Sequence, residues 1–262
     1  MAAEPAQRAA VAPLRVRSAS LMWSLAGVGV VLQICYPLSS GAVRDRLTIA
    51  IVIALSAACI AHAALTCGRR VATAVLLTTA GGGFLVEAVG AYAGVPFGRY
   101  RYTDSLGPHL LGVPVVIALA WTMLAWPAVV GARRLVTGRA ARVLVGGWAL
   151  CAADLFLDPQ MVAAGYWRWA DPTPHLPGVA TVALSNLAGW LVVSIVFSAT
   201  LNRLLGPGPQ PADDRLAVGL YVWLWAGWTV ALLVFLGLPA AALWGAFGMG
   251  VVAVPLAARL RR

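Results

Sequence analysis

The amino-acid sequence predicts an all-α polytopic membrane protein with about eight transmembrane helices, and three observations lead to that fold class. Apolar runs of about 20 residues recur along the whole chain, which is the length that a helix needs to cross a bilayer. Hydrophobic residues make up 61% of the chain and charged residues 11%, whereas a soluble domain carries about 25% charged residues. Two stretches of the chain also resemble each other, as the parallel repeats of some membrane proteins do.

The predicted membrane spans are separated by short connectors. They cover residues 20–38, 47–67, 71–94, 110–131, 143–162, 181–205, 216–236 and 239–259. Residues 1–19 are predicted to be a tail. A signal peptide is the alternative, but the run after the tail is long enough to span and shows no convincing cleavage site. The first six spans form a core over 20–205, residues 206–215 form a polar linker, and residues 216–262 form a final helix pair with a basic tail.

All nineteen basic residues are arginine, and their distribution predicts the topology. With eight spans, both termini and three connectors share one side of the membrane, and these segments hold fourteen arginines against five in the opposite loops. Positive charge gathers in cytoplasmic loops, so we expect a multi-pass protein of the cell membrane with both termini in the cytoplasm. This bias accounts for the basic excess, and we infer no nucleic-acid partner from it.

Residues 87–121 recur, with small changes of spacing, at residues 154–190. In each copy an acid is followed by a Gly-x-aromatic-Arg-aromatic segment, a Pro-His-Leu segment and a closing tryptophan. The offset is 67 residues at the acids and 66 at Pro-His-Leu, and three extra residues precede the second tryptophan. The matched residues are Glu87 with Asp154, Tyr100 with Trp167, Arg101 with Arg168, Tyr102 with Trp169, Asp104 with Asp171, His109 with His175, and Trp121 with Trp190. We expect helices 3 and 4 and helices 5 and 6 to be a parallel repeat whose first acids face each other across an axis along the membrane normal. The alternative is coincidence in a chain rich in Ala, Gly, Val and Leu.

Four acids are candidate catalytic residues: Glu87, Asp154, Asp158 and Asp104. An acid inside a membrane span is energetically unfavourable without a partner, so each such acid is expected to have a functional or structural role. Asp154 and Asp158 lie four residues apart and share a helix face, and Pro159 is expected to end or kink that helix. Two adjacent carboxylates repel each other, so one of the pair is expected to hold a proton, as a general acid must. The alternative is a structural role in which the acids pair with arginines of the repeated loops.

Aromatic residues at matched places in the two copies are candidate substrate-binding residues. They are Tyr100, Tyr102, Trp121, Trp167, Trp169 and Trp190. Aromatic faces stabilise cations, so protonated acids beside electron-rich rings suit a carbocation made from an alkene. An interfacial aromatic belt is the alternative explanation.

The remaining charged residues of the two loops are expected to hold the loops in place and to tune the acids. They are Arg101, Arg168, His109, His175 and Asp171. Proton transfer is the alternative role for the two histidines. We expect no metal site, because these histidines belong to different copies and lack tight ligand spacing. The four cysteines also lack metal-ligand spacing and are expected to pack as small apolar residues.

Segments of both copies resemble the membrane-bound carotenoid biosynthesis proteins typified by the carotenoid 1,2-hydratase CruF. In the first copy the matching segments are Gly94-Val-Pro-Phe-Gly-Arg-Tyr-Arg-Tyr102 and Leu111-Gly-Val-Pro114. In the second they are Asp158-Pro159, Gly165-Tyr-Trp-Arg-Trp169 and Asn186-Leu-Ala-Gly-Trp190, which adds Asn186 to the candidate substrate-binding residues. The resemblance covers residues 86–190, and it departs from the expected Gly-Val-Pro at residues 178–180, where the chain has Gly-Val-Ala.

The resemblance implies hydration of the terminal C1–C2 double bond of an acyclic (ψ) carotenoid end, such as that of bisanhydrobacterioruberin or a lycopene-type carotenoid. It implies no cofactor, and the sequence has no Gly-rich nucleotide loop. The implied partners are a lipophilic carotenoid, membrane lipid and other carotenoid-pathway enzymes. A proton-coupled small transporter and a non-catalytic carotenoid-binding subunit are the alternatives.

Overall fold

The computed structural model of the chain describes residues 4–207 and 213–260. Eight helices in this part are long and apolar enough to cross a membrane, which confirms the predicted fold class and number of spans. The helices are α1 (Glu4–Cys35), α2 (Gly41–Cys67), α3 (Arg69–Leu76), α4 (Gly82–Ala93), α5 (Val115–Leu135), α6 (Arg139–Ala163), α7 (Leu184–Leu205), α8 (Arg215–Val230) and α9 (Pro239–Leu260). A π-helical segment, η2 (Leu77–Gly81), joins α3 to α4 in one span, and a second, η4 (Ala231–Phe235), prolongs α8.

Some boundaries differ from those predicted. Helix α1 begins at Glu4, so the residues predicted to form a tail are helical from there on, while the apolar span that begins within α1 covers Ala19–Leu38, close to the predicted start. The fourth span begins at Val115, five residues later than predicted, because strands β2 (His109–Leu110) and β3 (Val113–Pro114) form a hairpin before it. Both turn residues of this hairpin have positive φ, as a tight two-residue turn requires. Of the predicted linker, residues 208–212 lie outside the described part of the chain.

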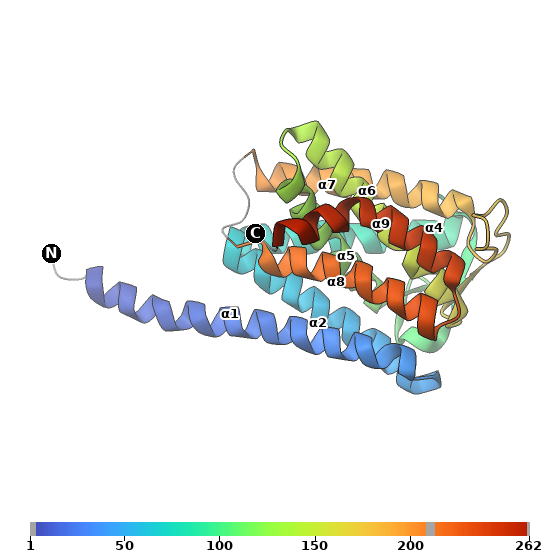
Figure 1. Ribbon diagram of the computed structural model, residues 1–262, viewed down its shortest axis with the longest axis horizontal. Coiled ribbons are helices and arrows are strands. Elements are labelled where there is room, and N and C mark those ends of the chain that lie inside the picture. Colours follow the sequence, from blue (N-terminus) through green and yellow to red (C-terminus); the bar gives the residue numbers. More distant parts are fainter. Residues whose placement is uncertain (1–3, 208–212, 261–262) are drawn as a thin grey trace.

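Helix α5 is the centre of the bundle, and most of its apolar stretch is buried. It packs against α2, α6 and α8, while α1 packs on α2, α7 on α6, and α9 on α6 and α8 (Figure 1). Large apolar side chains on the outer faces of the bundle are exposed, among them Val31, Leu233 and Phe247. Exposed apolar surface of this kind is expected where a protein faces lipid.

The two repeated loops meet in a short antiparallel sheet. Strand β1 (Tyr100–Tyr102) pairs with β4 (Trp167–Trp169) in a register that sets Arg101 opposite Arg168. Residues that alternate along a strand point to opposite faces. The aromatic residues of both strands therefore face the bundle, and the two arginines are exposed.

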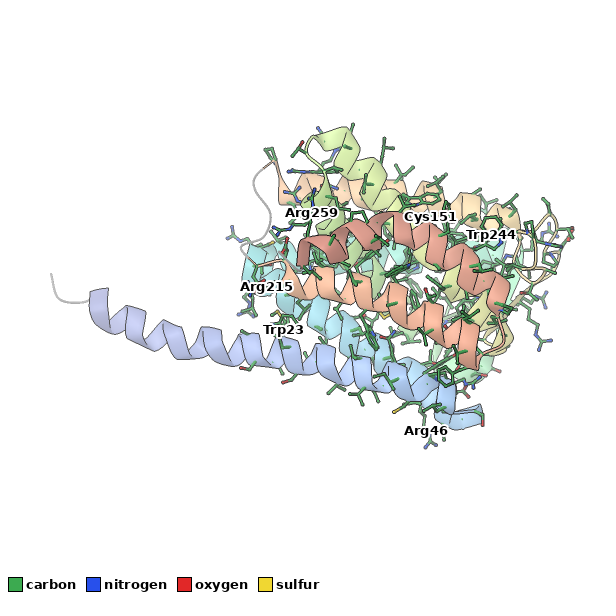
Figure 2. All side chains as sticks on the ribbon, viewed as in Figure 1. Trp23, Arg46, Cys151, Arg215, Trp244 and Arg259 are labelled. Carbon is green, nitrogen blue, oxygen red and sulfur yellow. The ribbon has the colours of Figure 1, made fainter. Side chains whose placement is uncertain are left out.

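The connectors after α2, α5 and α7 lie at the end of the bundle where the last described residues lie, and α1 starts beyond that end (Figure 1). Arg215 and Arg259 are near this end, whereas Arg46 is near the opposite end (Figure 2). The β1–β4 loops are at the end away from the arginine-rich connectors. The assignment of the arginine-rich end to the cytoplasm stays a prediction.

Candidate active site

A cavity of about 420 Å³ lies beneath the β1–β4 sheet, within the range of about 300–1,000 Å³ typical of ligand pockets. Its walls come from helices α1, α2 and α4 to α8 and from strands β1 and β4, and they are mostly apolar. All seven residues predicted to bind substrate border it: Tyr100, Tyr102, Trp121, Trp167, Trp169, Asn186 and Trp190. The structure therefore gathers residues of both copies around one space.

Glu87 of α4 is buried at the edge of this cavity and accepts hydrogen bonds from three side chains. The hydroxyl of Tyr100 donates to Glu87 Oε2, the hydroxyl of Tyr102 donates to the same oxygen over 2.9 Å, and Trp121 Nε1 donates to Oε1 over 3.1 Å. Burial raises the pKa of both tyrosine hydroxyls, and the neighbouring Glu87 raises it further. Both tyrosines therefore keep their protons and remain donors to Glu87.

Two glycines of α4 make this arrangement possible. A Cβ atom at Gly83 would overlap the ring of Trp121, and one at Gly90 would lie 2.9 Å from Phe97 Cδ2 and 3.0 Å from the Tyr100 hydroxyl. Small residues on a membrane helix allow neighbours to approach closely. Here the neighbours are the aromatic rings that surround Glu87.

Asp154 and Asp158 of α6 are also buried, and Asn186 of α7 joins them. Asn186 Nδ2 donates to Asp154 Oδ2 over 2.8 Å and also to Asp158 Oδ2. The other oxygen of Asp158, Oδ1, accepts from Trp167 Nε1 over 3.1 Å, whereas Asp154 Oδ1 has no hydrogen-bond partner. Helix α6 continues past Pro159 to Ala163, so of the two expected effects of this proline, an end or a kink, the helix does not end there. Helix α6 packs against α5, α7 and α9.

Of the two aspartates, Asp158 borders the large cavity together with Glu87, and Asp154 does not. Asp154 instead borders a separate cavity of about 20 Å³ between α6 and α7. The sequence repeat predicts that Glu87 and Asp154 face each other. The structure brings Glu87 and Asp158 to a common space, because Asp158 lies one helical turn nearer to β4. Helices α4 and α6 both pack against α5.

Aromatic rings of the two copies contact each other in pairs along the cavity. The Trp121 and Trp190 rings are nearly parallel, with centroids 4.2 Å apart and an interplanar angle of 17°. The rings of Tyr102 and Trp167 meet edge to face at 5.4 Å. These pairs join residues that correspond, or nearly correspond, in the two copies, although the repeat itself stays a prediction. The rings form an electron-rich wall beside the buried acids.

The other predicted site residues lie away from the cavity. Asp104 is exposed at the start of the short helix η3 (Asp104–Leu106), so it is not placed to act with Glu87. Asp171 is exposed and accepts hydrogen bonds from the backbone and hydroxyl of Thr173, which lower the pKa of its carboxyl. These contacts fix the local loop conformation.

The loop arginines and histidines are also remote from the acids. Arg101 and Arg168 point away from the acids, because they alternate with the inward-facing aromatic residues of their strands. His175 is exposed, and His109 belongs to the β2–β3 hairpin. In the described part of the chain, no arginine forms an ion pair with Glu87, Asp154 or Asp158, and the ion pair found joins Arg134 to Asp214. The interactions that hold the three acids come from aromatic and amide groups.

Several cavity residues were missed from the sequence. They include Gln33, Tyr36, Gln160 and Trp223. The two glutamines are polar residues inside apolar spans, which was a usable signal. Tyr36 and Trp223 gave no signal beyond that of an interfacial aromatic residue.

The fold and the site together define a helical, multi-pass membrane protein with an apolar cavity that holds buried acids and aromatic rings. Residues 48–253 match the family described as carotenoid biosynthesis protein, and the chain belongs to this family. It is 33% identical over 156 residues to a bisanhydrobacterioruberin hydratase of Haloarcula japonica, an alignment that covers 54% of this chain and 50% of that protein. The chain thus spans about half the length of this relative. No solved structure matches the chain.

Proposed function

We propose that this protein hydrates the terminal C1–C2 double bond of an acyclic carotenoid end to give a tertiary 1-hydroxy group. The observation that carries the proposal is that the carboxyls of Glu87 and Asp158 border one apolar, aromatic-lined cavity. The name of the relative from Haloarcula japonica supports the same reaction class.

Hydration of an unactivated alkene begins with proton transfer to carbon, and the Asp154–Asp158 pair is suited to supply that proton. The two carboxyls share the amide of Asn186, and adjacent carboxylates repel, so the pair can keep one proton between them. Only Asp158 reaches the cavity. The Asp158 O–H bond breaks, its proton and the alkene π electrons form the new C2–H bond, and C1 becomes a tertiary cation.

The aromatic wall and Glu87 complete the reaction. Electron-rich rings stabilise a cation that lies against their faces, and Trp121 and Trp190 border the cavity. The lone pair of a water oxygen forms the C1–O bond, and Glu87, which accepts three hydrogen bonds and donates none of those found, takes the surplus proton. That proton returns to the aspartate pair before the next turnover, so the net change is addition of one water.

Expression in a host that accumulates a ψ-ended carotenoid tests this function. The expected result is a pigment heavier by one water, absent from cells that carry the empty vector. If the folded wild-type protein adds no water to any such carotenoid, hydration is refuted. Proton-driven solute uptake without any pigment change would favour the transporter, and bound but unchanged pigment would favour a carotenoid-binding subunit.

A further inference from the structure

The large cavity reaches the outer surface of the bundle between two segments that are distant in sequence. One segment is the end of α1 with the short helix η1 (Tyr36–Leu38), and the other is α8 with η4. Ile34 and Leu38 on the first segment, and Val230 and Phe235 on the second, border the cavity although each is at least half exposed. A residue that borders a cavity and is also exposed marks its opening.

The α8 side of this opening is shaped as a groove. Trp223, Gly227 and Val230 lie at helical spacing and therefore share one face of α8, and all three border the cavity. Gly227 has no side chain, and a Cβ atom there would lie 3.5 Å from the Trp223 ring, at van der Waals contact, so a larger side chain would compete with the ring for the space beside it. At the mouth the helix changes to the π-helical segment η4, and such segments often occur at functional sites.

One hydrogen bond crosses the opening. Trp223 Nε1 donates to Gln33 Oε1 over 2.7 Å and links α8 to α1 across 190 residues of sequence. The other residues of the opening named above are apolar. The opening is therefore lined by apolar groups and crossed by the Gln33–Trp223 hydrogen bond, and α1 also packs on α8 and η1 on η4.

We propose that the gap between α1–η1 and α8–η4 is a lateral groove that admits the polyene chain of the substrate from the membrane and holds it. This inference rests on the proposed function. A long polyene is dissolved in the bilayer and is longer than a cavity of about 420 Å³ can enclose. The reacting end lies at the acids, and the remainder of the chain lies along Gly227 and Val230 beneath the Gln33–Trp223 contact.

Matched substitutions on α8 test the groove. In Gly227→Leu the new side chain fills the groove, whereas Gly219→Leu places the same group on the same helix away from the cavity, where an added Cβ atom meets no atom within 4 Å. Each variant is assayed with a long ψ-ended carotenoid and with a short isoprenoid that carries the same terminal alkene. Filling the groove should lower kcat/KM for the long substrate about tenfold or more, as overpacking by 1–3 kcal/mol implies. The loss for the short substrate should be much smaller, because less of that molecule lies in the groove.

A second pair of variants tests the groove independently, in case Gly227→Leu does not fold. Val230→Trp obstructs the mouth, and Val234→Trp is its control, because both positions are more than half exposed and only Val230 borders the cavity. Equal effects of Gly227→Leu and Gly219→Leu on the long substrate would overturn the groove, as would equal losses for long and short substrates. The groove would also be overturned if Gly227→Leu displaced a co-purified acyl lipid while the turnover of the long substrate stayed unchanged.

Pigment retention separates the groove from the reaction. If the wild-type protein hydrates neither substrate, the proposed function fails, but the amount of long carotenoid that co-purifies with each variant still reports on the groove. Loss of retained carotenoid in Gly227→Leu and Val230→Trp, with both controls unchanged, supports the groove. Retention that is the same in all four variants overturns it.

Discussion

Replacing Asp158 by asparagine should abolish most of the hydration activity, whereas the same replacement at Asp154 should not. Both oxygens of Asp158 accept hydrogen bonds, so an amide at this position must turn its NH₂ group toward either Trp167 or Asn186. One hydrogen bond is then lost and a buried donor is left without a partner, which costs about 1–3 kcal/mol. Removal of the proton donor itself should lower kcat about 10²–10⁴-fold.

Asp154→Asn is the matched control, because the structure predicts a much smaller effect. Asp154 Oδ1 has no partner, so the NH₂ group can occupy that position while the remaining oxygen keeps the hydrogen bond from Asn186. What is lost is the second acid of the pair, and we expect less than about a tenfold decrease in kcat from the loss of one neighbouring interaction.

The assay is single-turnover hydration of a ψ-ended carotenoid by purified protein in lipid vesicles, with the water-added product measured by mass. Thermal unfolding of each variant is measured to check that both remain folded. The reasoning is refuted if Asp154→Asn loses as much activity as Asp158→Asn, or if Asp158→Asn retains near wild-type rates. Equal loss in both variants would thus refute a separate role for Asp158 and assign the chemistry to the pair as one unit.

Three further predictions follow from the geometry. Gly83→Ala should push Trp121 away from Glu87 and reduce stability by about 1–3 kcal/mol. Gly81→Ala, where an added Cβ atom meets no atom within 4 Å, should do neither, and equal melting temperatures for the two variants would contradict this. The pKa of Tyr100 and Tyr102 is raised in the folded state, so their contribution to stability is fully present below about pH 10 and is lost as the pH rises from there through the folded-state pKa. Replacing both by phenylalanine should make the folded fraction less sensitive to alkaline pH. Phenolate absorbance from these two residues near pH 10 in the folded protein would argue against this. Cysteines introduced at Gly138 and Ser105 should react with impermeant reagents from opposite sides of the membrane, and reaction of both from one side would remove the predicted topology.

The sequence was sufficient for the fold class and for the acidic and aromatic part of the cavity wall. Apolar spans can be predicted because the free energy of transfer into a bilayer is nearly a sum over neighbouring residues. The repeat pointed to Glu87 and to the aromatic residues of β1 and β4. Asn186 came only from the resemblance to a family, because an isolated asparagine in an apolar span carries no spacing of its own.

The roles of the loop residues could not be predicted from sequence matches between the copies. Asp104, Arg101 and Arg168 correspond as well between the copies as the aromatic residues do, and yet all three are exposed. The side of a strand on which a residue lies depends on the pairing of β1 with β4, which the sequence does not state.

Tertiary structure alone decided which acid meets Glu87 and where the cavity opens. Asp154 and Asp158 share a helix face, so periodicity cannot separate them, and the difference arises because α6 is positioned so that only Asp158 reaches the space beneath β4. The opening depends on the approach of α1 to α8, which are joined by a hydrogen bond across 190 residues. Local sequence determines which segments enter the membrane, because burial in lipid is a property of each segment. The shape of the site arises from contacts between distant segments, and only the folded chain specifies these.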